Sequence, residues 1–336
     1  MSDLKILALM SPSGVGDYAA CPMRAVLDAD YPRIEKPQFK CYSDFGKVCH
    51  WAAQYQIGAA TKEDRPEQAV WDSAMQTPDV PNTPANFANR VELCATVANE
   101  VVRNATPGKT WEGELKAYDR NRLPKRVGRK GDVCGFGGSI DLVAADRSVL
   151  WDYKFVGAKK VPSEGDINPK FRPDAGILPV GNAGIKNTYV WQCGSYHILT
   201  NIPKTNVVWV GRDGKARSHI SINWDHERGV TFARTIDRFL KFVDSPIYRE
   251  TAWPVRGAHC DECSHKDRCP AWSFQAAQNP GYVRAVSNFS ALESLIGHTD
   301  SAALPPPPPP PKPSLVLPPP PPPPGFTPPP PPLFDL

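Results

Sequence analysis

Apolar residues in the first third of the chain recur at the spacing of amphipathic helices. Within residues 45–60, Phe45, Cys49 and Ala52 lie three or four positions apart, which predicts a helix. A second helix is predicted over 84–105, where the pattern stops just before a Pro-Gly pair. By the same argument, further helices are predicted within 11–35, 187–201 and 228–245.

The spacing then changes to two, which is typical of half-buried strands. Strands are predicted over 111–118, 135–145 and 148–157, and a hairpin over 205–221 with Asp213-Gly214 in its turn. Residues 157–186 are rich in Gly, Pro and charge and are predicted to form a long loop or lid. Helices, then strands, then helices indicate an α/β or α+β fold with a small sheet.

The end of the chain has a different composition. From Leu304 onward, 20 of the 33 residues are proline, and proline supplies no backbone donor for a packed core. We therefore expect a folded domain over 1–285 and a disordered proline-rich linker and tail over 286–336. Such a tail should be extended and stiff, and its tip "PPLFDL" could dock a protein partner.

Charge and cysteine content narrow the class of protein. The net charge of +4 is mildly basic and compatible with nucleic-acid binding. With neither a signal-peptide pattern nor about 18 consecutive apolar residues, the sequence predicts a soluble, cytoplasmic protein. Nine cysteines in a reducing compartment favour metal binding over disulfides, because several of them cluster.

Two acidic residues are predicted to meet on one hairpin. A turn at Asp146-Arg147 pairs residues whose numbers sum to 293, so Asp141 lies opposite Asp152 and Lys154 lies on the same face. The opposite face is predicted to be wholly apolar. Both carboxylates could then bind one Mg²⁺ or Mn²⁺, the equipment for metal-assisted phosphodiester hydrolysis. An ordinary solvated hairpin face is the alternative.

Four short motifs occur in order: Gly46-x-x-x-His50, Gly138-x-x-Asp141, Asp152-x-Lys154 and Gln192-x-x-x-Tyr196. Together they resemble the PD-(D/E)XK nuclease superfamily and its RecB-like branch, whose core is restriction-endonuclease-like, with a small mixed sheet flanked by helices. The resemblance implies these roles: metal ligands at His50, Asp141, Asp152 and the Tyr153 carbonyl; charge stabilisation by Lys154; contacts with DNA or Lys154 from Gln192 and Tyr196.

A further acid precedes the hairpin in "WEGELKAY", where Glu112 and Glu114 share a strand face. The resemblance favours Glu114 as an additional catalytic residue; a solvated strand edge is the alternative. Between this strand and the hairpin lies the basic segment 120–130. It is predicted to track a phosphate backbone, unless it is simply a solvated loop.

The clustered cysteines are Cys260, Cys263 and Cys269, with Cys21 as the candidate fourth thiolate. This arrangement resembles the iron–sulfur nucleases of the RecB-like branch, such as the CRISPR adaptation nucleases and the AddB nuclease domain. The resemblance implies a [4Fe-4S] cluster that staples the two ends of the domain. Four thiolates also suit structural Zn²⁺, so ligand chemistry alone leaves both open.

These observations predict a Mg²⁺- or Mn²⁺-dependent DNA nuclease. The expected activity is that of an exonuclease on single strands or DNA ends, in recombination, repair, phage DNA metabolism or CRISPR adaptation. The alternative is a non-catalytic DNA-binding or scaffold protein that recruits partners through its polyproline tail.

Overall fold

The computed structural model describes residues 7–21, 23–24, 27, 37–79, 83–119, 134–163, 166–167, 188–244, 263–265 and 269. Several predictions lie outside these residues: the basic segment 120–130, Cys260, the domain boundary at 285 and the proline-rich tail. Of the predicted loop 157–186, the described part includes one short 3-10 helix, η1 Ala158–Lys160.

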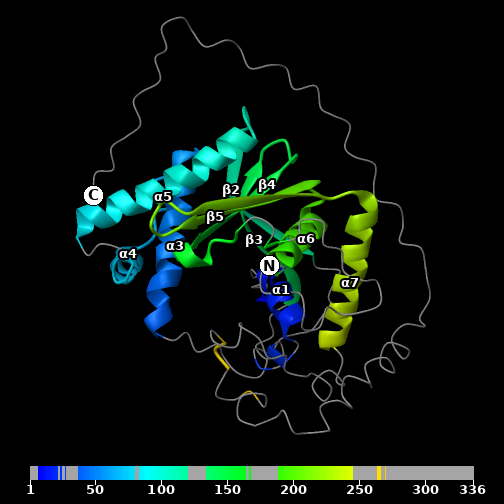
Figure 1. The fold of residues 1–336 in the computed structure, drawn as a ribbon. Helices are drawn as coiled ribbons and strands as arrows, with labels where there is room; N and C mark the ends of the chain where they lie inside the picture. Colours follow the sequence, from blue (N-terminus) through cyan, green and yellow to red (C-terminus); the bar gives the residue numbers. More distant parts are fainter. Residues whose placement is uncertain are drawn as a thin grey trace, which may run out of the picture. The chain divides into compact units, whose positions relative to one another are not determined.

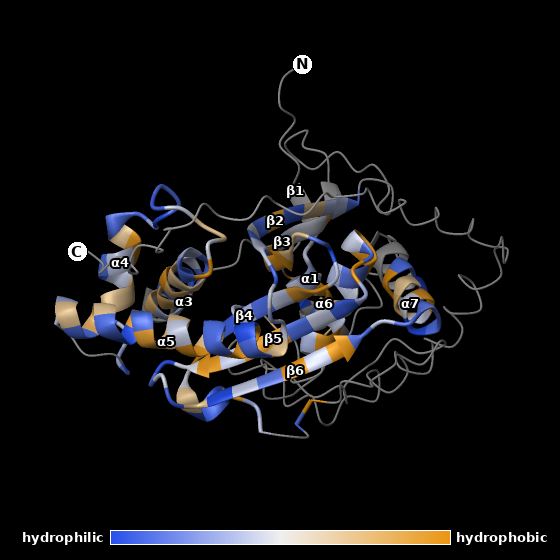
Figure 2. Cartoon of the chain, turned by 90° about the horizontal axis from the view of Figure 1, so that it is seen from above, coloured by the Kyte–Doolittle hydropathy of each residue, from blue (hydrophilic) through white to orange (hydrophobic). Residues whose placement is uncertain are grey.

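Six strands form one mixed sheet, with the order β1-β3-β4-β5-β6 and β2 paired to β3 (Figures 1 and 2). Their bounds are β1 Leu7–Met10, β2 Trp111–Asp119, β3 Cys134–Ala144, β4 Leu150–Val156, β5 Lys204–Gly211 and β6 Arg217–Asn223. Strand β3 is antiparallel to β2 and β4 and parallel to β1, whereas β4 and β5 are parallel. The predicted mixed α/β architecture is therefore confirmed, although strand β1 was not predicted.

Helices cover both faces of this sheet. Their bounds are α1 Pro12–Ala20, α3 Pro37–Gln56, α4 Gln68–Met75, α5 Pro84–Ala105, α6 Thr188–Thr200 and α7 His226–Asp244. Helices α3 and α5 pack on β4, whereas α6 packs on β2 and β5 and contacts α1 and α7 (Figure 1). Along α7, hydrophilic and hydrophobic positions alternate, as expected for a helix with one buried side (Figure 2).

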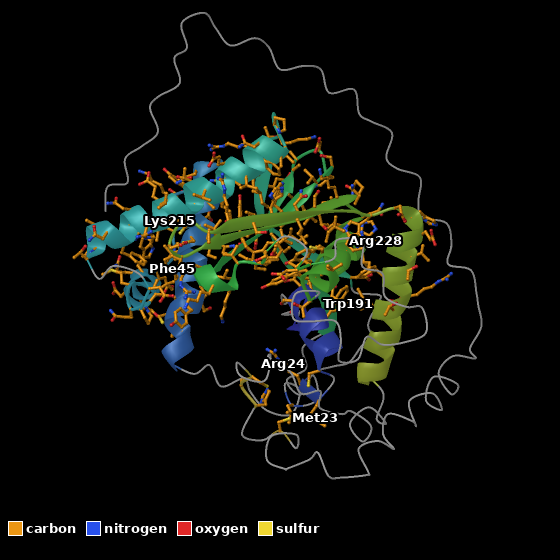
Figure 3. All side chains as sticks on the ribbon, in the orientation of Figure 1. Met23, Arg24, Phe45, Trp191, Lys215 and Arg228 are labelled. Atoms are coloured by element: carbon orange, nitrogen blue, oxygen red, sulfur yellow. The ribbon has the colours of Figure 1, made fainter. Side chains whose placement is uncertain are left out.

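Neighbouring residues of β4 show which helices lie on which face. The hydroxyl of Tyr153 donates to Asn99 of α5, whereas the side chain of the adjacent Asp152 accepts from Gln192 of α6. Because successive side chains of a strand point to opposite faces, α5 and α6 cover opposite sides of the sheet. Phe45 on α3 and Trp191 on α6, both labelled in Figure 3, mark the two apolar layers.

Local signals in the sequence explain where several elements begin and turn. Helix α5 starts at Pro84, after Thr83, whose side-chain oxygen caps the helix by accepting from the backbone N–H of Asn86. The β5–β6 turn contains Asp213 and Gly214, as predicted, and Gly214 adopts φ +69°. In the part of the chain that the structure describes, no helix is both long and apolar enough to cross a membrane.

Candidate active site

The candidate site lies where β3 and β4 separate. The ladder pairs Leu142 with Trp151 and Val143 with Leu150, so the predicted register is confirmed. The ladder ends there, and the expected pairing of Asp141 with Asp152 does not form. Instead, Oδ2 of Asp141 accepts a hydrogen bond of 2.8 Å from the backbone N–H of Tyr153. The two acids therefore lie in the opening between the diverging strands.

The predicted division of this hairpin into one apolar and one polar face is wrong. Ile140 and Val143 both pack with Leu150 and Tyr196 in one buried cluster. Residues three apart in a regular strand would point to opposite faces, so the alternation of β3 is interrupted between them. The face of β4 that carries Asp152 is consequently lined by apolar neighbours, which explains the burial of this acid.

Asp152 is 1% exposed, and its carboxylate contacts side chains of α6 and β4. Its Oδ1 accepts hydrogen bonds from Nε2 of Gln192 at 2.9 Å and from the hydroxyl of Tyr196 at 3.2 Å. Gln192 and Tyr196 are one turn apart on α6, which directs both side chains to the same acid. The ammonium of Lys154 lies 2.6 Å from Oδ2 and completes the environment of the carboxylate.

Burial dominates the electrostatics of this acid. It raises the pKa of Asp152 to about 6, even though the neighbouring Lys154 acts in the opposite direction. For Lys154, burial would lower the pKa, but Asp152 and Asp141 raise it above its ordinary value. Lys154 therefore stays protonated at neutral pH, whereas Asp152 is a carboxylate that takes up a proton only slightly below neutrality.

His50 of α3 faces Asp141 across the opening. Its Nδ1 lies 3.5 Å from Oδ1 of Asp141, and its ring contacts the rings of Tyr153 and Phe155 edge-on. Burial opposes the charge on both members of this pair. Their mutual attraction nevertheless prevails, so the pKa of His50 is raised and that of Asp141 is lowered.

Glu114, and a glutamine that the sequence analysis did not identify, complete the group. Nε2 of Gln54 donates to the carbonyl of Asp141 at 2.9 Å and to Oε1 of Glu114 at 3.2 Å. Glu112, the other predicted candidate, pairs instead with Arg147 at 2.7 Å on the surface. The spacing of four residues between Gly46, His50 and Gln54 could have indicated Gln54, because it places all three on one side of α3.

A cleft of about 540 Å³ opens beside these residues. Its walls come from α3, from the loop that follows it and from β2. Its lining residues are Ser43, Gly46, Lys47, His50, Trp51, Gln54, Ala59, Ala60, Asp64, Pro66, Gly113 and Glu114. A β-carbon on Gly46 would have no atom within 4 Å, so this glycine leaves open space in front of α3.

The donor types of the site suit a hard divalent cation, because Asp141 and Asp152 supply carboxylate oxygens and His50 an imidazole. Oδ2 of Asp152 is buried and lies 2.6 Å from the ammonium of Lys154, so a cation at this oxygen would bind beside that charge. Among the described residues, however, no three His, Cys, Asp or Glu side chains gather closely enough to hold an ion. Tyr153, whose carbonyl is the remaining predicted ligand, directly follows Asp152 on β4.

The predicted thiolate ligands are only partly described. Cys21 is buried just after α1, and Cys263 and Cys269 are partly exposed. Within the described part of the chain these cysteines form no metal-binding group. Cys49 and Cys94 are fully buried, as expected for small packing residues.

Part of the chain is similar to a known protein family, and the fold is similar to solved structures. A model of the PD-(D/E)XK nuclease superfamily matches residues 9–171. A putative exonuclease from Eubacterium rectale is 13% identical, with a TM-score of 0.41 over 76% of this chain and 87% of that one. An alkaline exonuclease from Laribacter hongkongensis is 14% identical, with a TM-score of 0.27 over 60% of this chain and 92% of that one. No curated protein matches the sequence.

The matched segment contains the strands that carry Asp141, Asp152 and Lys154, together with the helix that carries His50. The motifs that resembled this superfamily therefore lie, except for Gln192 and Tyr196, inside the segment that the family model matches. Residues 9–171 of this chain are therefore similar to the PD-(D/E)XK nuclease superfamily.

Proposed function

We propose that this protein is a Mg²⁺- or Mn²⁺-dependent deoxyribonuclease that acts as an exonuclease on single-stranded DNA or DNA ends. The observation that carries the proposal is the pairing of a buried acid, Asp152, with Lys154 beside a second acid, Asp141, in a segment of the nuclease superfamily. Acids of this kind serve a metal-dependent phosphodiester cleavage better than a structural role, because burying them destabilises the fold.

Each side chain has a distinct task in this proposal. Asp141, Asp152 and His50 would hold the divalent cation, with the Tyr153 carbonyl as a further ligand and Glu114 in contact with a second cation or a coordinated water. When bound, such a cation polarises the phosphate and lowers the pKa of a coordinated water. Lys154 keeps its positive charge beside Asp152 and offsets negative charge that develops on the phosphate. Gln192 and Tyr196 hold Asp152 in place through its Oδ1.

A cleft lies beside the site residues. Its volume of about 540 Å³ is in the size range of pockets that bind small molecules, so it could hold one nucleotide of a DNA strand. The basic segment 120–130 would contact the phosphate backbone of the DNA. Such an exonuclease would act in recombination, repair, phage DNA metabolism or CRISPR adaptation.

We further propose that Cys21, Cys260, Cys263 and Cys269 bind a [4Fe-4S] cluster that joins the two ends of a nuclease domain spanning 1–285. The burial of Cys21 and the spacing of the other three cysteines support this role. Such a cluster would require the reducing conditions of the cytoplasm. The polyproline tail over 286–336 would serve as a tether whose tip binds a protein partner.

A nuclease assay on a labelled single strand, with and without Mg²⁺ or Mn²⁺, tests the proposal. Asp141→Ala and Asp152→Ala should each abolish cleavage while most DNA binding remains, and Lys154→Ala should be nearly as severe. Gln56→Ala is a suitable control, because Gln56 lies on α3 but bonds to Asn99 of α5. If the wild-type protein binds DNA and never cleaves it with either metal, the alternative of a non-catalytic DNA-binding or scaffold protein is correct.

A further inference from the structure

One side of α3 carries three residues at steps of four: Gly46, His50 and Gln54. Side chains four apart lie above one another on a helix, and all three residues line the cleft next to Glu114. Gln56, only two residues further on, points away and exchanges hydrogen bonds with α5. Helix α3 therefore directs Gln54 to the candidate site and Gln56 to α5.

The amide of Gln54 connects two strands of the sheet. Its side chain is buried, and one nitrogen donates both to the carbonyl of Asp141 on β3 and to the carboxylate of Glu114 on β2. The register places Glu114 opposite Asp141, between the pairs formed by their neighbours. Gln54 thus contacts the backbone of one acidic residue and the side chain of the other.

The backbone of Glu114 needs such support. Its φ of 48° lies in the left-handed region, which residues with a side chain seldom occupy. Next to it, a β-carbon on Gly113 would lie 2.5 Å from the carbonyl oxygen of Ala59, so the loop after α3 packs tightly against this strand. That loop also donates two backbone hydrogen bonds, from Ala59 and Ala60, to the carbonyl of Gln54. Both the main chain and the side chain of Gln54 are therefore fixed against Glu114.

We infer that Gln54 is a positioning residue that orients the carboxylate of Glu114 and the backbone of Asp141 for binding a divalent cation. The inference rests on the proposed function, because it assigns Gln54 a task in the same metal site. Gln54 itself is neither a ligand nor a catalytic residue. A hydrogen bond to a ligand fixes its orientation, and losing such a bond typically weakens metal binding about 10–100-fold.

Direct titration of Mn²⁺ into metal-free protein without DNA, followed by calorimetry, tests this role. Gln54→Met keeps the length of the side chain but removes the donor, and we expect a Kd for Mn²⁺ about 10-fold weaker. Gln56→Met, on the same helix, should keep the wild-type Kd. Gln54→Asn is a second variant in case Gln54→Met does not fold; its shorter amide cannot reach both partners and should also weaken binding.

Combination with Glu114→Gln shows whether Gln54 acts through Glu114. If it does, Gln54→Met should weaken Mn²⁺ binding less in the Glu114→Gln background than in the wild type. Equal effects in the two backgrounds, or a Gln54→Met protein that binds Mn²⁺ like the Gln56→Met control, would overturn the inference. Wild-type protein that neither binds Mn²⁺ nor cleaves DNA would overturn the proposed function itself, so the two failures are distinguishable.

Discussion

Replacing Asp152 by asparagine should remove a pH dependence from the stability of the metal-free protein. Asparagine has the shape of aspartate and can still accept the hydrogen bonds from Gln192 and Tyr196 through its Oδ1. It cannot ionise, so it removes the pH-dependent cost of a charge at a position that is 1% exposed, whereas its loss of the ion pair with Lys154 is the same at each pH from 4 to 7.

The size of the effect follows from the pKa of the buried acid. Burial raises the pKa of Asp152 from the ordinary 3.8 to about 6, with Lys154 already paired to it. Between these two values the folded state holds a proton that the unfolded state has released, so wild-type stability falls as pH rises from about 4 to about 6. A difference of about two pKa units corresponds to roughly 3 kcal/mol in the free energy of unfolding.

Urea unfolding in the presence of a chelator, at pH 4, 5, 6 and 7, measures this difference. The free energy of unfolding of Asp152→Asn minus that of the wild type should increase by roughly 3 kcal/mol between pH 4 and pH 7. Effects of other titrating groups, such as Asp44, are common to both proteins and largely cancel. Asp146→Asn is a control that should change in parallel with the wild type between pH 4 and pH 7, because Lys109 and Ser148 lower the pKa of Asp146 to about 2 and the group is ionised in this range in both states. If the free energies of unfolding of wild type and Asp152→Asn change with pH in parallel, ionisation of Asp152 does not destabilise the folded protein. The electrostatic argument for the site would then fail.

Three further predictions concern other parts of the chain. Gly113→Ala should destabilise the protein by about 1–3 kcal/mol, because its β-carbon would lie 2.5 Å from a backbone oxygen; Gly46→Ala, which meets no atom within 4 Å, should be neutral or slightly stabilising in thermal unfolding. Cys21→Ser should lose iron and stability in anaerobically purified protein, whereas stoichiometric zinc in the wild type would contradict the cluster. Deleting 286–336 should leave cleavage of naked single strands nearly unchanged, and a large loss there would place part of the enzyme in the tail.

The features that the sequence predicted well are those set by local signals. The limits of α5 follow from Thr83 and Pro84 at its start and from the Pro-Gly pair after its end. The register of β3 and β4 follows from the turn alone, since a turn at Asp146-Arg147 fixes which residues face each other.

The contacts that sequence patterns did not predict join residues far apart in the chain. Gln54 is 60 residues from Glu114 and 87 from Asp141, and the spacing of apolar residues along the sequence does not indicate contacts between residues so far apart. The separation of β3 from β4 is equally non-local. On one side of β3, β1 pairs with its start and β4 with its end, so the edge between them, next to Asp141, remains open. Alternation along β3 assumes an uninterrupted ladder, and for this reason the prediction of two distinct faces was wrong.

That open edge links the fold to the proposed chemistry. If β3 and β4 stayed paired, the backbone N–H of Tyr153 would serve the ladder; in the opened hairpin it donates to the carboxylate of Asp141 instead. One oxygen of Asp141 is thereby fixed, while the other faces His50. Asp152 is fixed in the same manner, with Oδ1 bonded from α6 and Oδ2 facing Lys154. Each acid thus has one oxygen that accepts hydrogen bonds from the fold and one that faces a charged side chain. A bound cation could compete with that side chain for the second oxygen and leave the hydrogen bonds of the first oxygen intact.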